Sequence, residues 1–239
     1  MLFRSQDNCS LIFIPRPSQL PQTIQAINEA SPYQDYITPA AYYRLFLPDL
    51  LPPDLKKVIY LDCDLVVQAD LSQLWEEKIE DYYILAVKSM WAGRDAQHFN
   101  SGVLVINLEQ WRRDELSRKA IEFLQKSNYS YFDQEVLNAI CINQWKELDP
   151  RWNVLRGILE YSSWEESPFS EQEYQNVIRD PYIIHYVSSA KPWNAPASKV
   201  PWSEVFFHYL DMTVWSGWRF TFRKRVQRRI IRDLKKLLR

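Results

Sequence analysis

Apolar runs of two kinds divide the chain into strands and helices. Short runs rich in Val, Ile and Leu have the length of buried strands, and segments with apolar residues every three or four positions indicate helices. The predicted strands are residues 10–14, 57–62, 82–87, 103–108 and 181–187. The predicted helices are a segment after Thr38-Pro39, residues 71–76, 107–126 and 133–142, and a segment from about residue 221 to the end. Since strands alternate with helices, the pattern predicts an α/β fold with a mostly parallel central sheet.

Local signals mark where two of these helices begin. Thr38 followed by Pro39 suits an N-cap and a first helical position. Asn107 with Gln110 resembles a capping box, with Asn in place of the usual Ser or Thr. The segments without such a pattern, which are expected to be irregular, are residues 143–180 and 190–202.

Two carboxylates stand at the end of the 57–62 run. Asp62 and Asp64 are separated by Cys63, and alternate side chains of a strand point to opposite faces. Both carboxylates are therefore expected to face the same way, with Cys63 on the other side. A pair of oxygen ligands at a strand end suits a divalent cation, and a cation there can hold a diphosphate. The alternative is a pair of aspartates that caps the strand end through neighbouring N–H groups.

The composition excludes several kinds of site. The 239-residue chain has four glycines and contains neither GxGxxG nor GxxxxGK, so no dinucleotide fingerprint or P-loop is expected. Its three cysteines show neither zinc-site spacing nor a disulfide framework, which favours a reducing compartment. We also expect no signal peptide, because no basic region precedes a long apolar one, and no membrane span, because no apolar stretch has the length.

Basic residues are concentrated at the C-terminus. Residues 217–239 hold ten of the chain's 29 Lys and Arg but only one of its 30 acidic residues, Asp233, so the body is acidic. On a helical wheel the apolar residues from Phe222 onward share one half, and Arg223 is the one basic residue beyond Arg219 inside that half. This predicts a basic amphipathic helix that docks on an anionic membrane surface. The alternative is an ordinary helix packed on the acidic body.

Several short motifs occur in a fixed order within residues 36–195. Each is common alone, whereas the ordered set is specific. The set consists of Tyr42-Tyr43-Arg44-Leu45, Asp62-Cys63-Asp64, Phe99-Asn100-Ser101-Gly102 with the run 103–108, Asp133-Gln134-Glu135-Val136-Leu137-Asn138, Ile184-His185-Tyr186, and Lys191-Pro192-Trp193. With these motifs the chain closely resembles glycosyltransferase family 8, which includes bacterial lipopolysaccharide galactosyl- and glucosyltransferases.

The resemblance implies a nucleotide-diphospho-sugar transferase (GT-A) fold, a Mn²⁺ ion with Mg²⁺ as the alternative, a UDP-hexose donor carrying galactose or glucose, and retention of the anomeric configuration. Two carboxylates and an imidazole suit Mn²⁺ better than oxygen ligands alone. The residues that match family positions are Asp62, Asp64 and His185 for the metal, Arg44, Asn100, Ser101 and Lys191 for the donor, and Asp133 and Gln134 beside the transferred sugar. Lys191 would add a positive charge to the diphosphate.

The match at Gln134 bears on the mechanism of retention. Retention usually needs two displacements through a carboxylate nucleophile, and an amide is a poor nucleophile. A same-face substitution through a short-lived oxocarbenium ion is therefore favoured, in which Gln134 stabilises charge and forms no bond.

The chain departs from the family pattern at three places. Family members begin with a strand–helix–strand unit that binds uracil and ribose, and the resemblance leads us to expect that this chain starts after that unit. No acid occurs at residues 86–89, where the family tends to place an Asp that holds the sugar hydroxyls, and Ser188 stands where related bacterial enzymes often have Gly. These departures predict weak UDP binding and leave open an inactive truncated transferase, either a pseudoenzyme or a fragment.

Structural interpretations also exist for the individual site residues. His185 could be a packed core histidine, Asp133 and Gln134 a helix N-cap and its neighbour, and Asn100 a turn residue before Gly102. A phosphatase of the haloacid-dehalogenase type would also use an Asp-x-Asp strand end. It needs a later Gly-Asp motif, however, which the sequence lacks.

We therefore expect a catalytic domain over residues 1–216 and a basic amphipathic tail over residues 217–239. The expected reaction transfers the hexose to a saccharide or lipid-linked acceptor in cell-surface polysaccharide or lipopolysaccharide synthesis. The expected location is the cytoplasm, peripheral on the inner face of the plasma membrane, with no nucleic-acid partner.

Overall fold

A computed structural model describes residues 39–91, 97–127 and 132–221, together with Ala26, Glu29, Val226 and Ile230. The described strands are β1 (Lys57–Leu61), β2 (Leu65–Val67), β3 (Ile84–Lys88), β4 (Phe99–Asn107), β5 (Trp145–Glu147), β6 (Val154–Leu155) and β7 (Ile183–His185). The described α-helices are α2 (Leu47–Leu50), α3 (Leu71–Trp75), α4 (Leu108–Arg113), α5 (Leu116–Lys126), α6 (Asp133–Ile140), α7 (Glu171–Arg179) and α8 (Ser203–Asp211). The 3₁₀ helices are η1 (Pro39–Phe46), η2 (Pro150–Asn153), η3 (Arg156–Glu160), η4 (Trp164–Glu166) and η5 (Ala197–Lys199). The predicted strand 10–14 and the Thr38 cap lie outside these residues, and of the helix predicted beyond residue 221 only Val226 and Ile230 are described, both as helical.

The larger sheet has the strand order β1-β4-β3-β5. β4 pairs antiparallel with both β1 and β3, while β3 and β5 are parallel. Three of these four described strands therefore share one direction, and β4 runs against them. The connection from Lys88 to Phe99 explains the reversal, since a parallel pair needs a crossover of about a dozen residues or more, usually helical.

The smaller sheet has the order β2-β7-β6, antiparallel on one side of β7 and parallel on the other. Its register places His185 opposite Leu65 of β2 and Leu155 of β6. His185 thus ends a strand that is hydrogen-bonded on both sides, which fixes its backbone.

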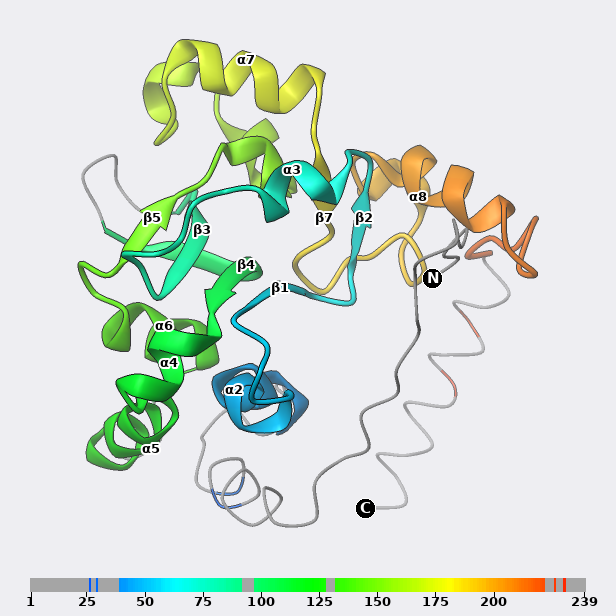
Figure 1. Ribbon diagram of the computed structural model, residues 1–239. Helices are drawn as coiled ribbons and strands as arrows, with labels where there is room; N and C mark the ends of the chain where they lie inside the picture. The colour runs from blue at the N-terminus through cyan, green and yellow to red at the C-terminus, as the bar shows by residue number, and fades with distance from the viewer. Residues whose placement is uncertain are drawn as a thin grey trace.

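Both faces of the larger sheet are covered. All nine residues of β4 are buried. Leu104 and Ile106 pack into a cluster with residues of η1, α4, α5 and α6, while Val103 and Val105 pack into one with residues of α3, η2 and β7. Figure 1 shows α4, α5 and α6 on one side of β4, and α3 and the smaller sheet on the other. A strand buried on both faces reads as a continuous apolar run, which is why 103–108 was recognisable.

The helix predicted over residues 107–126 is divided in two. Asn107 caps α4 as expected, because its side chain accepts a hydrogen bond from the Gln110 N–H at 3.0 Å. The Gln110 side chain bonds the Glu80 carbonyl, so the reciprocal half of the capping box is not formed. Glu115 then adopts φ 51°, a left-handed conformation that separates α4 from α5.

The segment predicted to be irregular, 143–180, contains regular structure. It holds β5, β6, three 3₁₀ helices and α7. α7 begins with a complete capping box between Ser170 and Glu173. Its apolar residues Tyr174, Val177 and Ile178 have the spacing of an amphipathic helix, but the segment is only nine residues long, so the pattern is brief. Within the described residues, no helix combines the length and the apolar composition that a bilayer crossing requires.

Candidate functional site

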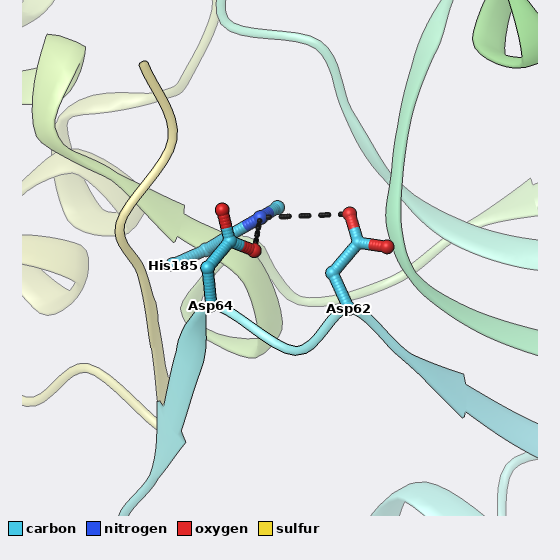
Figure 2. Close-up of side chains that lie close together, drawn as sticks. All are labelled: Asp62, Asp64 and His185. Atoms are coloured by element: carbon cyan, nitrogen blue, oxygen red, sulfur yellow. Dashed lines mark hydrogen bonds and ion pairs between the residues drawn. The ribbon is translucent and has the colours of Figure 1, made fainter. Parts of the chain in front are cut away.

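Asp62 and Asp64 lie in a bend that joins the two sheets. β1 ends at Leu61 and β2 begins at Leu65. The Asp62 N–H donates to the Gly102 carbonyl at 2.8 Å, and the Asp64 carbonyl accepts from the Tyr186 N–H at 2.8 Å. Both carboxylates point toward His185 (Figure 2). The expected common direction is observed, but it comes from this bend and not from the alternation of one continuous strand.

His185 completes a compact group with the two aspartates. Its Nε2 lies 3.0 Å from Asp64 Oδ1 and 3.6 Å from Asp62 Oδ2, and its side chain is 3% exposed. The ligand atoms of all three residues lie within 4.8 Å of one another. They come from segments more than 100 residues apart in sequence, since the His185–Asp64 contact spans 121 positions.

The donor set of this group fits a divalent cation. Two carboxylate oxygens and one imidazole nitrogen are ligands that Mn²⁺ accepts. Burial alone would raise the pKa of Asp64, but hydrogen bonds and charge from His185 and Lys191 outweigh it and lower that pKa. Asp64 is therefore held in the ionised form that a metal ligand requires.

Lys191 approaches the same carboxylate from the loop after β7. Its ammonium group contacts the Asp64 carboxylate and the Tyr186 carbonyl. The loop is fixed by Asn194, whose side chain accepts from the Lys191 N–H at 2.8 Å. Ser188 adopts φ 81° here, a left-handed conformation that favours glycine. This is the loop position at which the sequence departs from the expected Gly.

Arg44 joins three further site residues in a buried cluster. From η1, its guanidinium donates to Asp62 Oδ1 at 2.8 Å, and its Nε lies 3.0 Å from Asp133 Oδ2. Its Nη1 donates to the Ser101 carbonyl at 2.8 Å and to the Ser101 hydroxyl at 2.9 Å. The guanidinium also lies over the Tyr60 ring, 4.6 Å from the centroid. One cation thus fixes the places of Asp62, Asp133 and Ser101.

The charges in this cluster are not balanced. Burial disfavours the charged form of Arg44, yet Asp133 and Asp62 outweigh it and raise the Arg44 pKa. Two carboxylates share this single guanidinium. Burial raises the pKa of Asp133 to about 6, and Asp62 adds to the rise, although Arg44 opposes it. The Asp133 carboxyl therefore takes up a proton at a higher pH than an ordinary aspartate does.

Asn100 and Gln134 meet beside this cluster. The Asn100 NH₂ donates to Gln134 Oε1 at 3.0 Å, and the Ser101 N–H donates to the same oxygen at 3.2 Å. Both acceptor positions of the Gln134 carbonyl are therefore engaged. The NH₂ group is the end of Gln134 without a hydrogen-bond partner among the described residues.

All nine residues predicted for the site lie in one connected network of contacts. Three residues that complete it were given no role by the sequence analysis: Tyr60, Asn153 and Gly102, the last of which was named only as part of a motif. Tyr60 donates to Asp62 Oδ1 at 2.7 Å, and Asn153 Oδ1 lies 2.9 Å from His185 Nδ1. An isolated Gly in an apolar strand signals close approach of another group, so Gly102 could have been found. The sequence carries no comparable signal for Tyr60 or Asn153.

The chain resembles known glycosyltransferases both in sequence and in structure. The sequence model of glycosyl transferase family 8 matches residues 3–197. General stress protein A of Bacillus subtilis (strain 168) is 35% identical over 195 residues, covering 76% of this chain and 68% of that protein. Glycosyltransferase GlyD of Streptococcus pneumoniae is 28% identical over 201 residues, which cover 74% of this chain but 23% of GlyD. The chain thus spans under a quarter of that longer relative.

Among solved structures, galactosyltransferase LgtC in complex with donor and acceptor sugar analogues superposes with a TM-score of 0.64. The two sequences are 26% identical, and the match covers 75% of this chain and 69% of LgtC. The fold is therefore the GT-A fold of nucleotide-sugar transferases, as the sequence predicted. The chain belongs to glycosyltransferase family 8.

Proposed function

We propose that this protein is a divalent-metal-dependent, retaining hexosyltransferase with a UDP-hexose donor carrying galactose or glucose. The observation that carries the proposal is the convergence of Asp62, Asp64 and His185 within 4.8 Å, with the Lys191 ammonium on the same carboxylate. Three residues that would bind the metal and one cation would then surround the diphosphate of the donor. The family and the fold support a transferase.

The chain's own residues divide the work of donor binding. Asp62, Asp64 and His185 would hold Mn²⁺, with Mg²⁺ as the alternative, and such an ion supplies Lewis-acid stabilisation to a diphosphate leaving group. Lys191 adds a second positive charge beside the metal group. When a donor binds, its ammonium group would leave Asp64 and contact a phosphate oxygen instead. Asn100 and Ser101, which bond Gln134, would lie beside the donor sugar.

Arg44 and Gln134 would shape the pocket around the reacting carbon. Arg44 holds Asp133 and Asp62 at fixed positions, so it would act by positioning both. Because the Gln134 carbonyl is engaged by two donors, its NH₂ group is the end left to contact a sugar oxygen. An amide held in this way is no nucleophile, which favours same-face substitution over a covalent glycosyl-enzyme.

The acceptor is proposed to be a saccharide or a lipid-linked saccharide of the cell surface. The basic residues of the 217–239 tail support a location on the inner face of an anionic membrane, where each such residue contributes about 1 kcal/mol. We assign residues 1–216 to the catalytic domain and keep the tail as a membrane-binding segment.

The test is Mn²⁺-dependent release of UDP from UDP-galactose and UDP-glucose, with and without a pool of saccharide acceptors. We expect release from one of the two donors, lost on chelation and in Asp64→Asn, and kept in Glu109→Gln, whose side chain is 64% exposed. Retention is checked by the anomeric configuration of the product. Release that survives chelation would contradict the metal role. Tight Mn²⁺ binding without turnover of any UDP-sugar would identify a pseudoenzyme.

A further inference from the structure

A chain of four polar side chains runs through the buried centre of the site. His185 Nδ1 lies 2.9 Å from Asn153 Oδ1, and the Asn153 NH₂ donates to Asn100 Oδ1 at 2.7 Å. The Asn100 NH₂ in turn donates to Gln134 Oε1 at 3.0 Å. His185, Asn153 and Asn100 are 3%, 4% and 7% exposed, so water does not compete for these bonds. The chain connects the imidazole of the candidate metal group to the amide beside the proposed sugar site.

Backbone groups of β4 fix the direction of every hydrogen bond in this chain. The Gly102 N–H, which can only donate, bonds Asn100 Oδ1 at 3.0 Å. This identifies the oxygen end of the Asn100 amide, so the Asn153 group facing it must be the NH₂. The Asn153 oxygen then faces His185 Nδ1. An oxygen there accepts a hydrogen bond only if Nδ1 carries a proton.

The same reasoning fixes the other end. The Ser101 N–H donates to Gln134 Oε1 at 3.2 Å, so this atom is an acceptor, and the Asn100 group that faces it is a donor. The orientations of the Gln134 amide and of the His185 ring are therefore set by one network.

We propose that Asn153 is a positioning residue of this site. It keeps Nδ1 of His185 protonated, so that Nε2 is the nitrogen presented to Asp64 and Asp62. Through Asn100 it also ties this orientation to that of Gln134. The consequence for metal binding rests on the proposed function, whereas the position of the proton does not.

Two acceptors compete for the ring proton of a neutral His185. Asp64 Oδ1 lies 3.0 Å from Nε2 and would attract a proton to that nitrogen, which would block its lone pair. Asn153 attracts the proton to Nδ1 and leaves the Nε2 lone pair toward the two carboxylates. Metal-binding histidines commonly donate the other ring N–H to such an acceptor, and loss of the acceptor costs about 10–100-fold in metal affinity or activity.

The local fold leaves Asn153 little freedom to turn away. It is the last residue of η2, which begins with Pro150 after Asp149, whose side chain accepts from the Arg151 N–H. The neighbouring Trp152 is 3% exposed and packs edge-on against Tyr182 at 4.8 Å. Asn153 is followed directly by β6, which pairs with β7 so that Leu155 lies opposite His185.

Three variants of the full-length chain test the proposal. Asn153→Leu removes both polar atoms at similar volume. Asn153→Asp keeps an acceptor for Nδ1 but replaces the NH₂ that faces Asn100. The control is Asn138→Leu, since Asn138 is also a buried amide beside the site, bonded to the Phe99 N–H and carbonyl and to the Gln134 carbonyl, without contact to His185.

Two readouts separate positioning from general damage. The first is ¹⁵N NMR of the histidine rings in metal-free protein in mildly alkaline buffer, where the chain's three histidines give few signals and His185→Gln assigns those of His185. The second is Mn²⁺ affinity, measured by the EPR signal of the free ion. Neither readout requires a known sugar donor. Side-chain amide signals of Gln134 report the far end of the chain.

We expect a protonated Nδ1 in the native chain and in Asn138→Leu. In Asn153→Leu the proton should move to Nε2, and Mn²⁺ affinity should fall about 10–100-fold. Asn153→Asp should restore the Nδ1 proton and the affinity, while the Gln134 amide signals shift in both Asn153 variants. An unprotonated Nδ1 in the native chain would overturn the proposal. So would a protonated Nδ1 with unchanged affinity in Asn153→Leu.

If Asn153→Leu does not fold, the NMR spectra of the native chain and of Asn153→Asp still test the proposal. Asn153→Asp must then keep the Nδ1 proton and move the Gln134 signals, and failure of either overturns the proposal. His185→Gln tests the proposed function separately. If its Mn²⁺ affinity equals that of the native chain, the metal role of His185 is wrong, while the NMR result still judges Asn153.

Discussion

The imidazole of His185 lies directly against the backbone of Gly102. A Cβ atom on Gly102 would lie 2.1 Å from His185 Cε1 and 2.5 Å from His185 Nδ1. It would also lie 3.1 Å from Asn100 Oδ1. Because β4 is buried along its whole length, the strand cannot retreat from the ring. The absence of a side chain at Gly102 is therefore what lets His185 reach the two aspartates.

Gly102→Ala should displace His185 from Asp62 and Asp64. We expect Mn²⁺ affinity to fall at least about tenfold, as for the loss of a partner that orients a metal ligand. Overpacking of this kind should also destabilise the fold by about 1–3 kcal/mol. Both are measured on the purified variant, by EPR titration of Mn²⁺ and by denaturant unfolding.

The matched control is Gly157→Ala. A Cβ there would meet Met90 Sδ at 2.9 Å, which is the end of a flexible side chain, so the neighbour can move. We expect this variant to keep native Mn²⁺ affinity. Similar affinities for the two alanine variants would show that close packing at Gly102 does not govern the site.

Replacing a residue of the metal group itself should reduce Mn²⁺ affinity more than Gly102→Ala does. Asp64→Asn removes one anionic ligand and the partner of the Lys191 ammonium, so Mn²⁺ binding should become undetectable at millimolar concentration of the ion. Glu109→Gln removes an exposed carboxylate, and this variant should bind Mn²⁺ with the affinity of the native chain. Isothermal titration calorimetry with Mn²⁺ measures both. Native affinity in Asp64→Asn would assign this carboxylate to a structural role.

The sequence predicted those parts of the fold that rest on strong local patterns. The continuous apolar runs predicted β1, β3, β4 and β7 within a few residues, because both faces of these strands pack against apolar clusters and admit few polar side chains. The sequence analysis missed α7 and α8, because each spans only nine residues and its helical spacing repeats too few times to stand out. Ser170 and Glu173 did signal the start of α7, and the capping box they form could have been read.

The sequence predicted the site residues whose side chains suggest metal or phosphate binding by their type alone. The two half-buried carboxylates Asp62 and Asp64 meet the buried imidazole of His185 in a group that suits a cation, and the ordered motifs singled these residues out. Asn153 could not be found, because an Asn before Val154-Leu155 looks like any turn residue. Its role depends on the β6–β7 register, which is a long-range property of the fold.

Arg44 and Asp133 form an ion pair, and the loss of stability should be larger when one partner is removed than when both are replaced by apolar residues. Arg44→Met leaves Asp133 buried without its cation and should destabilise the protein by about 3–5 kcal/mol. The double variant Arg44→Met with Asp133→Leu removes both charges. Its free energy of unfolding should be closer to that of the native chain than the sum of the two single changes predicts. A coupling of about 1–3 kcal/mol is expected for contacting residues. Urea unfolding of the four proteins measures it, and additive effects would contradict the pairing.

Asp133 also predicts how stability depends on pH. Burial raises the pKa of its carboxyl to about 6 in the folded chain, while an unfolded Asp titrates near its ordinary value of 3.8. Between these values the folded chain holds a proton that the unfolded chain has released, so the free energy of unfolding falls as pH rises from about 4 to about 6.

The size of this fall should be on the order of 2 kcal/mol. Asp133→Asn should remove it, since an amide does not titrate, whereas Glu109→Gln should leave it in place. The measurement is urea unfolding of metal-free protein at several pH values between 4 and 7. A native chain and an Asp133→Asn variant with parallel pH curves would refute the assignment.

The charge of the C-terminal segment predicts salt-sensitive membrane binding. Four of its basic residues can be neutralised together to Gln, namely Lys224, Arg225, Arg228 and Arg229. Each contributes about 1 kcal/mol near an anionic leaflet, so the change should weaken binding to phosphatidylglycerol vesicles by roughly a thousandfold at low salt. The matched control neutralises four cations of the body that are exposed or partly exposed, namely Lys56, Arg113, Arg118 and Arg156. In a co-sedimentation assay the tail variant should stay in the supernatant, whereas the control variant should pellet with phosphatidylglycerol vesicles as the native chain does. Neither variant should pellet with phosphatidylcholine vesicles. If the tail variant pellets with phosphatidylglycerol as the native chain does, the segment serves another purpose, such as packing against the acidic body of the protein.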